Sequence, residues 1–230
     1  MKQGIFYGVG IGPGDPELLT LKAVRVLEHC PVIAAPQTKS GEMLAMDIAS
    51  GVVDLSGKTI VPLRFVMERD PEKLRQTHLT AAEAVEAYLA KGLDVAMLNL
   101  GDVSIYATYS YLMEILKERG YETVMIPGVP SFCAVAARLK VSLTEMNNTL
   151  HIAPGSAALE ETLDLPGTKI LMKSGRQMPA VLKALAEKGV LERSMLVQNC
   201  GLPGEAVYPD LSEDVPAEEM GYFATVIVKE

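Results

Sequence analysis

The sequence predicts an α/β protein of two αβα domains, the first with a mainly parallel sheet and the second with a mixed sheet. Apolar strand segments alternate with helical segments of ten or more residues over most of the chain, a pattern typical of parallel sheets covered by helices. Near the carboxyl terminus strands follow one another without helices, which indicates antiparallel members. The 230 residues, 49% of them apolar, suffice for two cores. We expect a boundary near residue 118, giving domains 1–118 and 119–230.

In the first half of the chain, predicted strands and helices alternate regularly. Short apolar runs predict the strands, and apolar residues that recur on one face predict the helices. Asp70 before Pro71 and Gly92 after the apolar face mark the start and the end of the longest helix. The predicted strands are residues 5–9, 32–35, 60–65, 93–98 and 121–126, and the predicted helices are residues 16–28, 43–49, 71–91 and 104–119.

The alternation restarts after Asn147 with shorter elements. In doubly wound sheets, ligands bind beyond the carboxyl ends of the strands. We therefore expect function in the loops that follow strands, at residues 8–15, 101–106, 127–131 and 173–176. The predicted strands of this second part are residues 150–153, 169–173, 195–199, 206–208 and 222–228, with helices near 157–162 and at 179–188.

A glycine-rich loop follows the first predicted strand, with the sequence G-V-G-I-G-P-G-D-P at residues 8–16. It does not match the dinucleotide-binding pattern G-x-G-x-x-G, because Pro13 or Asp15 stands where the last glycine would have to be. Asp15 and Pro16 have instead the pattern of an N-cap followed by proline at the first helical position, so a carboxylate fills the place of a phosphate. The loop predicts either close approach of a ligand without phosphate or a plain turn rich in glycine.

The composition argues against several classes of partner. A formal net charge of -8 disfavours nucleic acid and anionic membranes, both of which need a basic surface. No apolar run reaches the roughly 20 residues that span a bilayer. Three scattered cysteines without a C-x-x-C pair fit a reducing cytoplasm better than a disulfide framework. We therefore expect a cytoplasmic protein without a nucleic-acid or membrane partner.

The common catalytic and metal-binding motifs are missing from the sequence. His29, His78 and His151 lack the spacing of metal ligands, so no metal site is predicted. There is no G-x-S-x-G elbow and no Walker lysine, which removes the main support for a hydrolase or a kinase. Asp102 ends a predicted strand and precedes a predicted helix. It is either an N-cap only or a carboxylate that meets a ligand bearing hydroxyls or positive charge.

Four motifs together resemble those of the class III S-adenosylmethionine-dependent methyltransferases, the tetrapyrrole methylase family. The motifs are G-x-G-x-G-P-G-D-P-x-L-L-T-x-K-A at residues 8–23, L-G-D-x-x-I-Y at residues 100–106, P-G-V-x-S-F at residues 127–132 and M-K-S-G-R at residues 172–176. The resemblance covers the whole chain. Segments 62–70, 101–111 and 126–132 are most similar to the family members that methylate carbon 20 of precorrin-2, or of its cobalt form, in cobalamin biosynthesis.

The resemblance implies a homodimer with S-adenosyl-L-methionine in the cleft between the two domains. By motif position, the cofactor contacts fall on Pro13, Leu100, Gly101, Asp102, Ile105, Pro130, Ser131, Lys173, Cys200 and Gly201. Pro130 stands where relatives usually carry Thr or Ser, which leaves main-chain contact there, and Lys173 stands where some carry Met. Methyl transfer by in-line displacement needs positioning rather than a nucleophilic side chain. A proton must then leave the methylated carbon, and no residue of the sequence identifies itself as the base.

The implied substrate is a tetrapyrrole with many carboxylates, which an acidic protein must bind through a local cationic rim. The predicted substrate contacts are Gly12, Arg64, Arg69 and Tyr106, and Lys39, Arg138 and Arg176 are further candidates for the rim. Each of these cations could instead be an ordinary surface charge. The alternative functions are methylation of another corrin carbon, nicotinamide-dependent oxidoreduction, and binding or assembly without catalysis.

Overall fold

The fold is described from a computed structural model that covers residues 2–65, 70–155 and 159–230. The chain forms two compact units, residues 1–130 and 131–230. This division lies later in the chain than the boundary expected near residue 118. The reason is that β5 (Thr123–Ile126) pairs with β1 (Phe6–Gly10), so the segment after residue 118 completes the sheet of the first unit.

The first unit has a five-stranded sheet in the order β3-β2-β4-β1-β5. All the pairs between these strands are parallel, which confirms the prediction for the first sheet. Because β1 lies between β4 and β5, the loops that leave these three strands emerge side by side at the carboxyl edge of the sheet. The remaining strands are β2 (Val32–Gln37), β3 (Thr59–Arg64) and β4 (Val95–Asn99).

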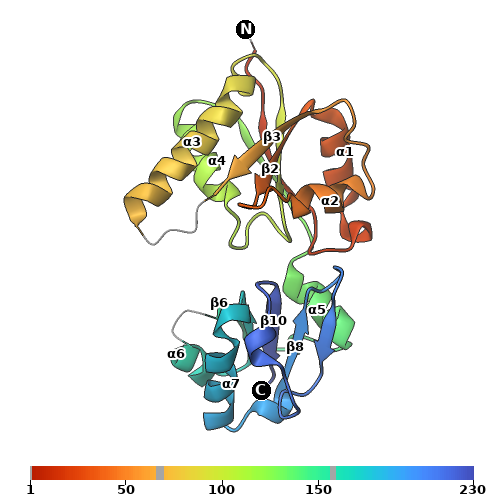
Figure 1. Ribbon diagram of the computed structural model, residues 1–230, viewed down its shortest axis with the longest axis vertical. Coiled ribbons are helices and arrows are strands. Elements are labelled where there is room, and N and C mark those ends of the chain that lie inside the picture. The colour runs from red at the N-terminus through yellow and green to blue at the C-terminus, as the bar shows by residue number, and fades with distance from the viewer. Residues whose placement is uncertain (1, 66–69, 156–158) are drawn as a thin grey trace. The chain divides into compact units, whose positions relative to one another are not determined.

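Helices cover both faces of this sheet (Figure 1). The helices α3 (Pro71–Leu89) and α4 (Tyr109–Glu118) lie on one side of the strands, and α1 (Leu21–His29) and α2 (Leu44–Ser50) lie on the other. Alternate residues of each strand face alternate sides of the sheet, so each face contributes its own set of apolar side chains. The core beneath α3 and α4 includes Phe6, Val32, Val61, Met97, Val85, Leu89, Leu112 and Leu116.

The buried side chain of Tyr109 explains one glycine of the glycine-rich loop. Its ring lies so close to β1 that a Cβ atom on Gly8 would be 2.6 Å from ring carbons. Its hydroxyl donates to the carbonyl oxygens of Phe6 and Val124, each at 3.1 Å, so the buried polar group is paired. Burial raises the pKa of Tyr109 well above its ordinary value, so the hydroxyl stays protonated. Gly8 therefore serves packing, not the binding of a ligand.

The first predicted helix is divided in the structure. Residues 16–28 form a 3₁₀ turn, η1 (Pro16–Leu18), followed by α1. Asp15 Oδ1 accepts a hydrogen bond from the N–H of Glu17 at 2.9 Å, so it caps η1 as the sequence predicted. Thr20 Oγ1 accepts from the N–H of Ala23 at 3.1 Å and caps α1 separately.

The helix expected from residue 104 begins only at Tyr109. Residues 100–108 form turns and a bend instead. The N-terminal part of the predicted helix is therefore a loop at the carboxyl edge of the sheet, next to the glycine-rich loop.

The second unit has a mixed sheet, as the sequence predicted, and its strand order is β6-β7-β10-β8-β9. The strands β6 (Leu150–Pro154) and β7 (Thr168–Met172) are parallel. In contrast, β10 (Ala224–Val228) runs antiparallel to β7 and to β8 (Ser194–Gln198), and β9 (Ala206–Tyr208) runs antiparallel to β8. The first residues of β10 consequently lie beside the last residues of β7 and β8.

The helices of the second unit are short. They are α5 (Ser131–Leu139), α6 (Leu159–Asp164) and α7 (Met178–Glu187), with 3₁₀ turns η2 (Gly175–Gln177), η3 (Leu191–Arg193) and η4 (Ala217–Glu219). The sequence analysis assigned no element to α5, although its buried residues Phe132, Val135 and Ala136 recur at helical spacing. Among the helices of the described residues, none is both long and apolar enough to cross a membrane.

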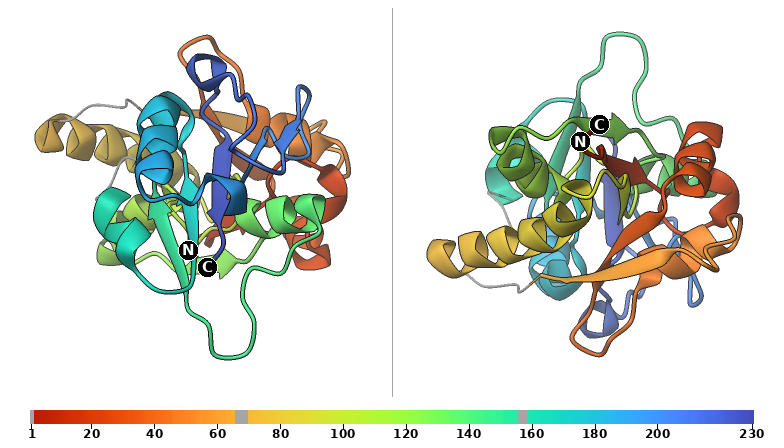
Figure 2. Two further views of the ribbon diagram at one scale, coloured as in Figure 1. Left: turned by 90° about the horizontal axis from the view of Figure 1, so that it is seen from below. Right: turned by 90° about the horizontal axis from the view of Figure 1, so that it is seen from above.

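A long connection, residues 140–149, joins α5 to β6 and extends outward from the second unit in both views of Figure 2. Lys229 near the end of the chain donates from Nζ to the carbonyl oxygen of Ser142 at 2.8 Å. The Thr144 hydroxyl donates to the carbonyl oxygen of Asn148 at 2.6 Å. The connection is therefore held by hydrogen bonds at its base and within its turn.

His78 on α3 couples the stability of the first unit to pH. Its ring stacks on Tyr111 of α4, with centroids 4.4 Å apart and planes 8° from parallel. Burial lowers the pKa of His78 below its ordinary 6.5, so the unfolded chain binds this proton more readily than the folded chain does. With His78 neutral, the free energy of unfolding of the first unit is at its full value above about pH 6.5. It decreases as the pH falls from there through the folded-state pKa of His78.

We predict that His78→Phe, which keeps a ring on Tyr111, removes this part of the pH dependence. Urea denaturation of both proteins at about pH 7.5 and about pH 5.5 measures it, because the two pH values lie on either side of the ordinary histidine pKa. Carboxylates titrate in both proteins and cancel in the difference. A difference in stability between the two proteins that is the same at both pH values would contradict the prediction.

Candidate functional site

Three loops of the first unit meet at the carboxyl edge of its sheet. They follow β1, β4 and β5, the three strands that lie next to one another. The connection after β1 leads toward β2 and the connection after β4 leads toward β5, so the strand order reverses here. In open α/β sheets the crevice at such a reversal is where ligands bind.

The backbones of the three loops are in direct contact. Gly12 and Gly101 form a bridge with hydrogen bonds of 3.3 and 2.7 Å. A Cβ atom on Gly10 would lie 2.6 Å from the N atom of Gly128, and one on Gly128 would lie 2.3 Å from the carbonyl oxygen of Gly101. Glycine is required at positions 10 and 128 because the loops pack on each other, which is a structural role that the sequence analysis did not foresee.

Asp102 fastens the second loop to the third. The side chain is 8% exposed, and its Oδ2 accepts a hydrogen bond from the N–H of Gly128 at 2.8 Å. Its Oδ1 accepts from the N–H of Ser104 at 2.8 Å and from the Ser104 hydroxyl. Burial by itself raises the pKa of Asp102, but the hydrogen bonds from Ser104 and Gly128 outweigh it, so the pKa lies below its ordinary value. Asp102 is thus an ionised clamp between loops, and not the N-cap of α4.

The predicted contacts of the first unit lie around this clamp. Tyr106 has a left-handed backbone with φ 49, and its side chain is 47% exposed. Such a conformation is costly for a residue other than glycine and is concentrated at functional sites. Pro13, Leu100, Ile105 and Pro130 are half-buried, whereas Gly12 and Gly101 are buried by the bridge. The structure therefore brings all the predicted contacts in these three loops to one edge of the sheet.

The cations predicted to bind the substrate lie in different environments. Arg64 is the last residue of the edge strand β3, and its Nε donates to Gln37 Oε1 at 3.1 Å. Arg69 lies outside the described residues. Arg138 of the second unit forms an ion pair with Glu205, which removes it from the candidates for binding an anion. Lys39 and Arg176 are exposed.

In the second unit, the predicted contacts Lys173, Cys200 and Gly201 follow β7 and β8. Lys173 has φ 56 and Gly201 has φ 75. The N–H of Gly201 donates to Glu205 Oε2 at 2.8 Å, and Glu205 also pairs with Arg138 on α5. This network fixes the loop after β8 to α5, the helix that begins with the predicted contact Ser131.

The thiol of Cys200 is not poised for chemistry. Burial, helped by the Glu205 carboxylate, raises its pKa to about 11. Only the thiolate is a good nucleophile, so Cys200 is nearly inert at neutral pH. Its place in the loop after β8 suits contact with a ligand, and a covalent role is not supported.

Sequence reasoning missed three residues of this edge. Asn199 directly follows β8 and has φ 52, and Tyr222 and Phe223 directly precede β10 with both side chains exposed. Tyr222 and Phe223 precede a strand, whereas the sequence pattern placed function only in loops that follow strands. The signal was present in the predicted antiparallel strands, because an antiparallel strand begins where its neighbours end.

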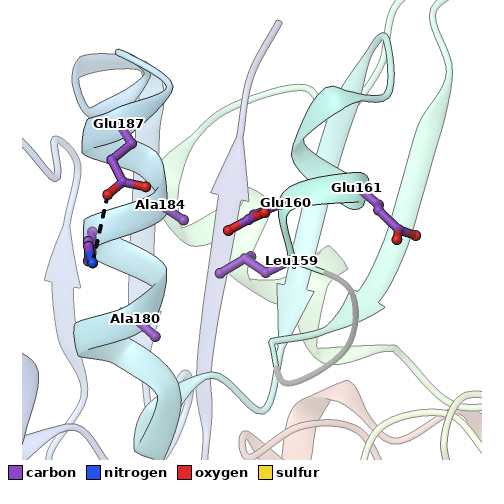
Figure 3. Close-up of a pocket in the computed structure, with 7 residues that line it drawn as sticks. Leu159, Glu160, Glu161, Ala180, Ala184 and Glu187 are labelled. Carbon is purple, nitrogen blue, oxygen red and sulfur yellow. Dashed lines mark ion pairs between the residues drawn. The ribbon is translucent and has the colours of Figure 1, made fainter.

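A separate surface pocket lies between α6 and α7 (Figure 3). Its carboxylates, from Glu160, Glu161 and Glu187, outnumber its one cation, Lys183, which lies 3.8 Å from Glu187. None of the predicted site residues lines it. An anionic ligand would be repelled there, so we do not assign this pocket to the site.

The fold and the loops at the two carboxyl edges agree with one protein family. Residues 6–216 match the Tetrapyrrole (Corrin/Porphyrin) Methylases. The chain belongs to this family, as its four motifs indicated.

Individual proteins similar to this chain are named as methyltransferases that act on particular tetrapyrroles. A protein of Methanocaldococcus jannaschii named Probable cobalt-precorrin-2 C(20)-methyltransferase is 40% identical over 73% of this chain and 71% of its own length. The Precorrin-2 C(20)-methyltransferase of Sinorhizobium sp is 33% identical over 98% of this chain and 95% of its own. The crystal structure of uroporphyrin-III-C-methyltransferase from Thermus thermophilus has a TM-score of 0.70 at 27% identity, covering 100% of this chain and 93% of that chain.

We predict that Asp102→Ala loosens the contact between the loops after β4 and β5. The change leaves the half-buried N–H of Gly128 without its acceptor, which costs about 1 kcal/mol in the free energy of unfolding. Urea denaturation measures the cost, and hydrogen exchange at the Gly128 amide localises it. Ser104→Ala removes only the hydroxyl contact and serves as the milder control. Wild-type stability together with unchanged exchange at Gly128 would show that Asp102 is not a clamp.

Proposed function

We propose that this chain uses S-adenosyl-L-methionine to methylate carbon 20 of precorrin-2, or of its cobalt form, in cobalamin biosynthesis. The observation that carries the proposal is the family match over most of the chain, together with two relatives whose names state this reaction. One of these relatives is named for the cobalt-containing substrate and the other for the metal-free one. Cobalt is therefore treated as part of the substrate, not as a metal held by the protein.

The first unit suits a donor that has no phosphate groups. Asp15 already caps η1, so a carboxylate stands where a phosphate would approach the start of this turn. The ionised Asp102 adds negative charge to the same edge of the sheet, which favours a cationic ligand. S-adenosyl-L-methionine supplies an activated methyl group on a positively charged sulfur.

The residues proposed to contact the donor act mainly through backbone and apolar atoms. Both carboxylate oxygens of Asp102 already accept hydrogen bonds from the protein, so its part is to hold the loops after β4 and β5 in register. The half-buried side chains beside it exclude water from the reacting groups. The proposed donor contacts are Pro13, Leu100, Gly101, Asp102, Ile105, Pro130, Ser131, Lys173, Cys200 and Gly201.

Positioning is the chemical contribution that these loops can make. Methyl transfer to carbon is a displacement in line with the bond that breaks, so the donor and acceptor atoms must be collinear. Holding two reactants in such a geometry supplies up to roughly 7–11 kcal/mol of the barrier. A nucleophilic side chain is not needed, which agrees with the raised pKa of Cys200.

We also propose that the enzyme is a cytoplasmic homodimer. The three cysteines are free thiols, which supports a reducing compartment. The assembly is inferred from the family resemblance alone. Light scattering tests it, since a dimer has twice the chain mass of 24.8 kDa.

We predict that the purified protein transfers a ¹³C-labelled methyl group from S-adenosyl-L-methionine to precorrin-2 under anaerobic conditions. NMR of the product should place the label at carbon 20, and parallel reactions with the cobalt-loaded ring show which form is preferred. Label at another corrin carbon would support the alternative within the same pathway and refute the proposed position.

Calorimetry separates the proposal from the other two functions. Binding of S-adenosylhomocysteine without binding of NAD supports the methyltransferase. Tight binding of NAD would revive the oxidoreductase, and binding of neither would favour a non-catalytic module. Glu187→Gln, which neutralises a carboxylate in the pocket between α6 and α7, is a control that should bind S-adenosylhomocysteine like the wild type.

For the substrate contacts, we predict that Arg64→Ala and Arg69→Ala weaken binding of precorrin-2 and spare S-adenosylhomocysteine. Loss of one charge-assisted contact costs about tenfold in affinity. Titration with each ligand measures the two affinities separately. Arg193→Ala is the matched control, because η3 precedes β8 and so lies at the opposite end of that strand. Equal losses for both ligands would contradict a role in substrate recognition.

A further inference from the structure

Three aromatic side chains of the first unit form a row that the predicted contacts do not include. Phe65 directly follows β3, His78 lies on α3, and Tyr111 lies in the first turn of α4. The rings of Phe65 and His78 have centroids 6.2 Å apart, and the ring of His78 stacks on that of Tyr111 at 4.4 Å. Since β3 ends and α4 begins at the carboxyl edge of the parallel sheet, this aromatic row lies close to the loop after β4.

Tyr111 is the exposed end of the aromatic row. The residue is 54% exposed, whereas Phe65 and His78 are half-buried. One face of the Tyr111 ring lies against His78, with planes 8° from parallel, so the exposed surface is its other face and its edge. A large aromatic ring that stays exposed beside other apolar surface is typical of a surface that meets a ligand.

The start of α4 fixes the direction in which Tyr111 points. Tyr109, two residues earlier, is buried, and its hydroxyl donates to the carbonyl oxygens of Phe6 and Val124. Residues two apart on a helix point to nearly opposite sides. The contacts that hold Tyr109 in the core therefore direct Tyr111 outward. A ring that is already held in place loses little conformational freedom when a ligand binds to it.

Cations accompany the aromatic row on the side of α3. Arg75 precedes His78 by three residues on this helix, a spacing that makes the two side chains neighbours. Arg64 ends β3, and both arginines are exposed. On the other side of the row, Glu114 follows Tyr111 by three residues on α4. An aromatic surface with cations along one side is complementary to a flat ligand that carries negative charge.

We infer that the aromatic row binds the tetrapyrrole, with one flat ring of the substrate stacked on Tyr111 and its carboxylates on the side of Arg64 and Arg75. This inference rests on the proposed function, which supplies the substrate, and it adds a recognition surface outside the predicted contacts. Flat conjugated rings attract one another in offset stacks, as the rings of Tyr111 and His78 already do. The adenine of the donor is also flat, but it has no negative charge for the arginines to attract.

Titrations of Tyr111→Leu with precorrin-2 under anaerobic conditions, and separately with S-adenosylhomocysteine, test the inference. Leucine keeps an apolar side chain but removes the flat ring, so affinity for precorrin-2 should fall about three- to tenfold while affinity for S-adenosylhomocysteine stays unchanged. Tyr111→Phe keeps the ring and should bind like the wild type. Tyr88→Leu is the matched control, because Tyr88 lies at the opposite end of α3 and both affinities should stay unchanged.

NMR of the tyrosine rings separates stacking on the ligand from a merely structural effect. The chain has only eight tyrosines, and the signal of Tyr111 is assigned by its loss in Tyr111→Phe. Adding precorrin-2 to the wild type should shift this signal and leave that of Tyr88 in place. His78 is a positioning residue, so His78→Ala should weaken precorrin-2 about two- to threefold, and the effect should be absent in the Tyr111→Leu background.

An unchanged affinity of Tyr111→Leu for precorrin-2, or a Tyr111 signal that precorrin-2 does not move, would overturn the inference. Equal losses for both ligands, or a loss for S-adenosylhomocysteine alone, would also overturn it. A Tyr111 signal that shifts with protein concentration before any ligand is added would show that a second copy of the chain covers the row, which likewise contradicts the inference.

The NMR experiment uses the wild type, so the inference stays testable if Tyr111→Leu does not fold. Where the wild type methylates precorrin-2 and these results are negative, only the inference fails. Where the wild type does not bind precorrin-2 at all, the proposed function fails as well, so the two failures are distinguishable.

Discussion

Contact between three backbone loops is the constraint on which the first unit's site depends. The strand order places the loops after β1, β4 and β5 next to one another, but adjacency alone does not fix their distance. Glycine at positions 10 and 128 allows the chains to touch, since a Cβ atom at either position would collide with a backbone atom of another loop. The carboxylate of Asp102 then fixes the contact by accepting the N–H of Gly128. Both features are needed, because close approach without an acceptor would bury an unpaired amide.

The parts of the fold that could be predicted from the sequence are those that a local sequence pattern defines. Apolar runs and caps located the strands of both sheets and the long helix α3, whose cap Asp70 accepts from the N–H of Glu72 as expected. The division between the units could not be found in this way. It depends on β5 pairing with β1, a contact between segments far apart in the chain. The helix α5 was also missed, although Phe132, Val135 and Ala136 give it a buried face with helical spacing.

In the candidate site, too, local sequence patterns could be read in advance but contacts between distant segments could not. The motif residues lie at the carboxyl edges of the two sheets, but the roles of individual glycines depend on partners that no local pattern reveals. Position 8 requires glycine because the ring of Tyr109 lies against it. Position 10 requires glycine because the backbone of Gly128 lies against it. Neither role requires a ligand. In the second unit, the aromatic pair before β10 was missed because function was expected only after strands, whereas an antiparallel strand brings its first residues beside the ends of β7 and β8.

Charge within the second unit helps to hold the loop after β8 in place. Arg138 is committed to Glu205, and through Glu205 it holds the N–H of Gly201 and the loop after β8. A cation engaged in this way stabilises the loop and has little charge left for a ligand. The ammonium of Lys173 makes a different contact, because it lies 5.7 Å from the centroid of the Tyr222 ring. Binding a polyanion with an acidic protein requires fixed local cations, because attraction cannot come from the net charge of the chain.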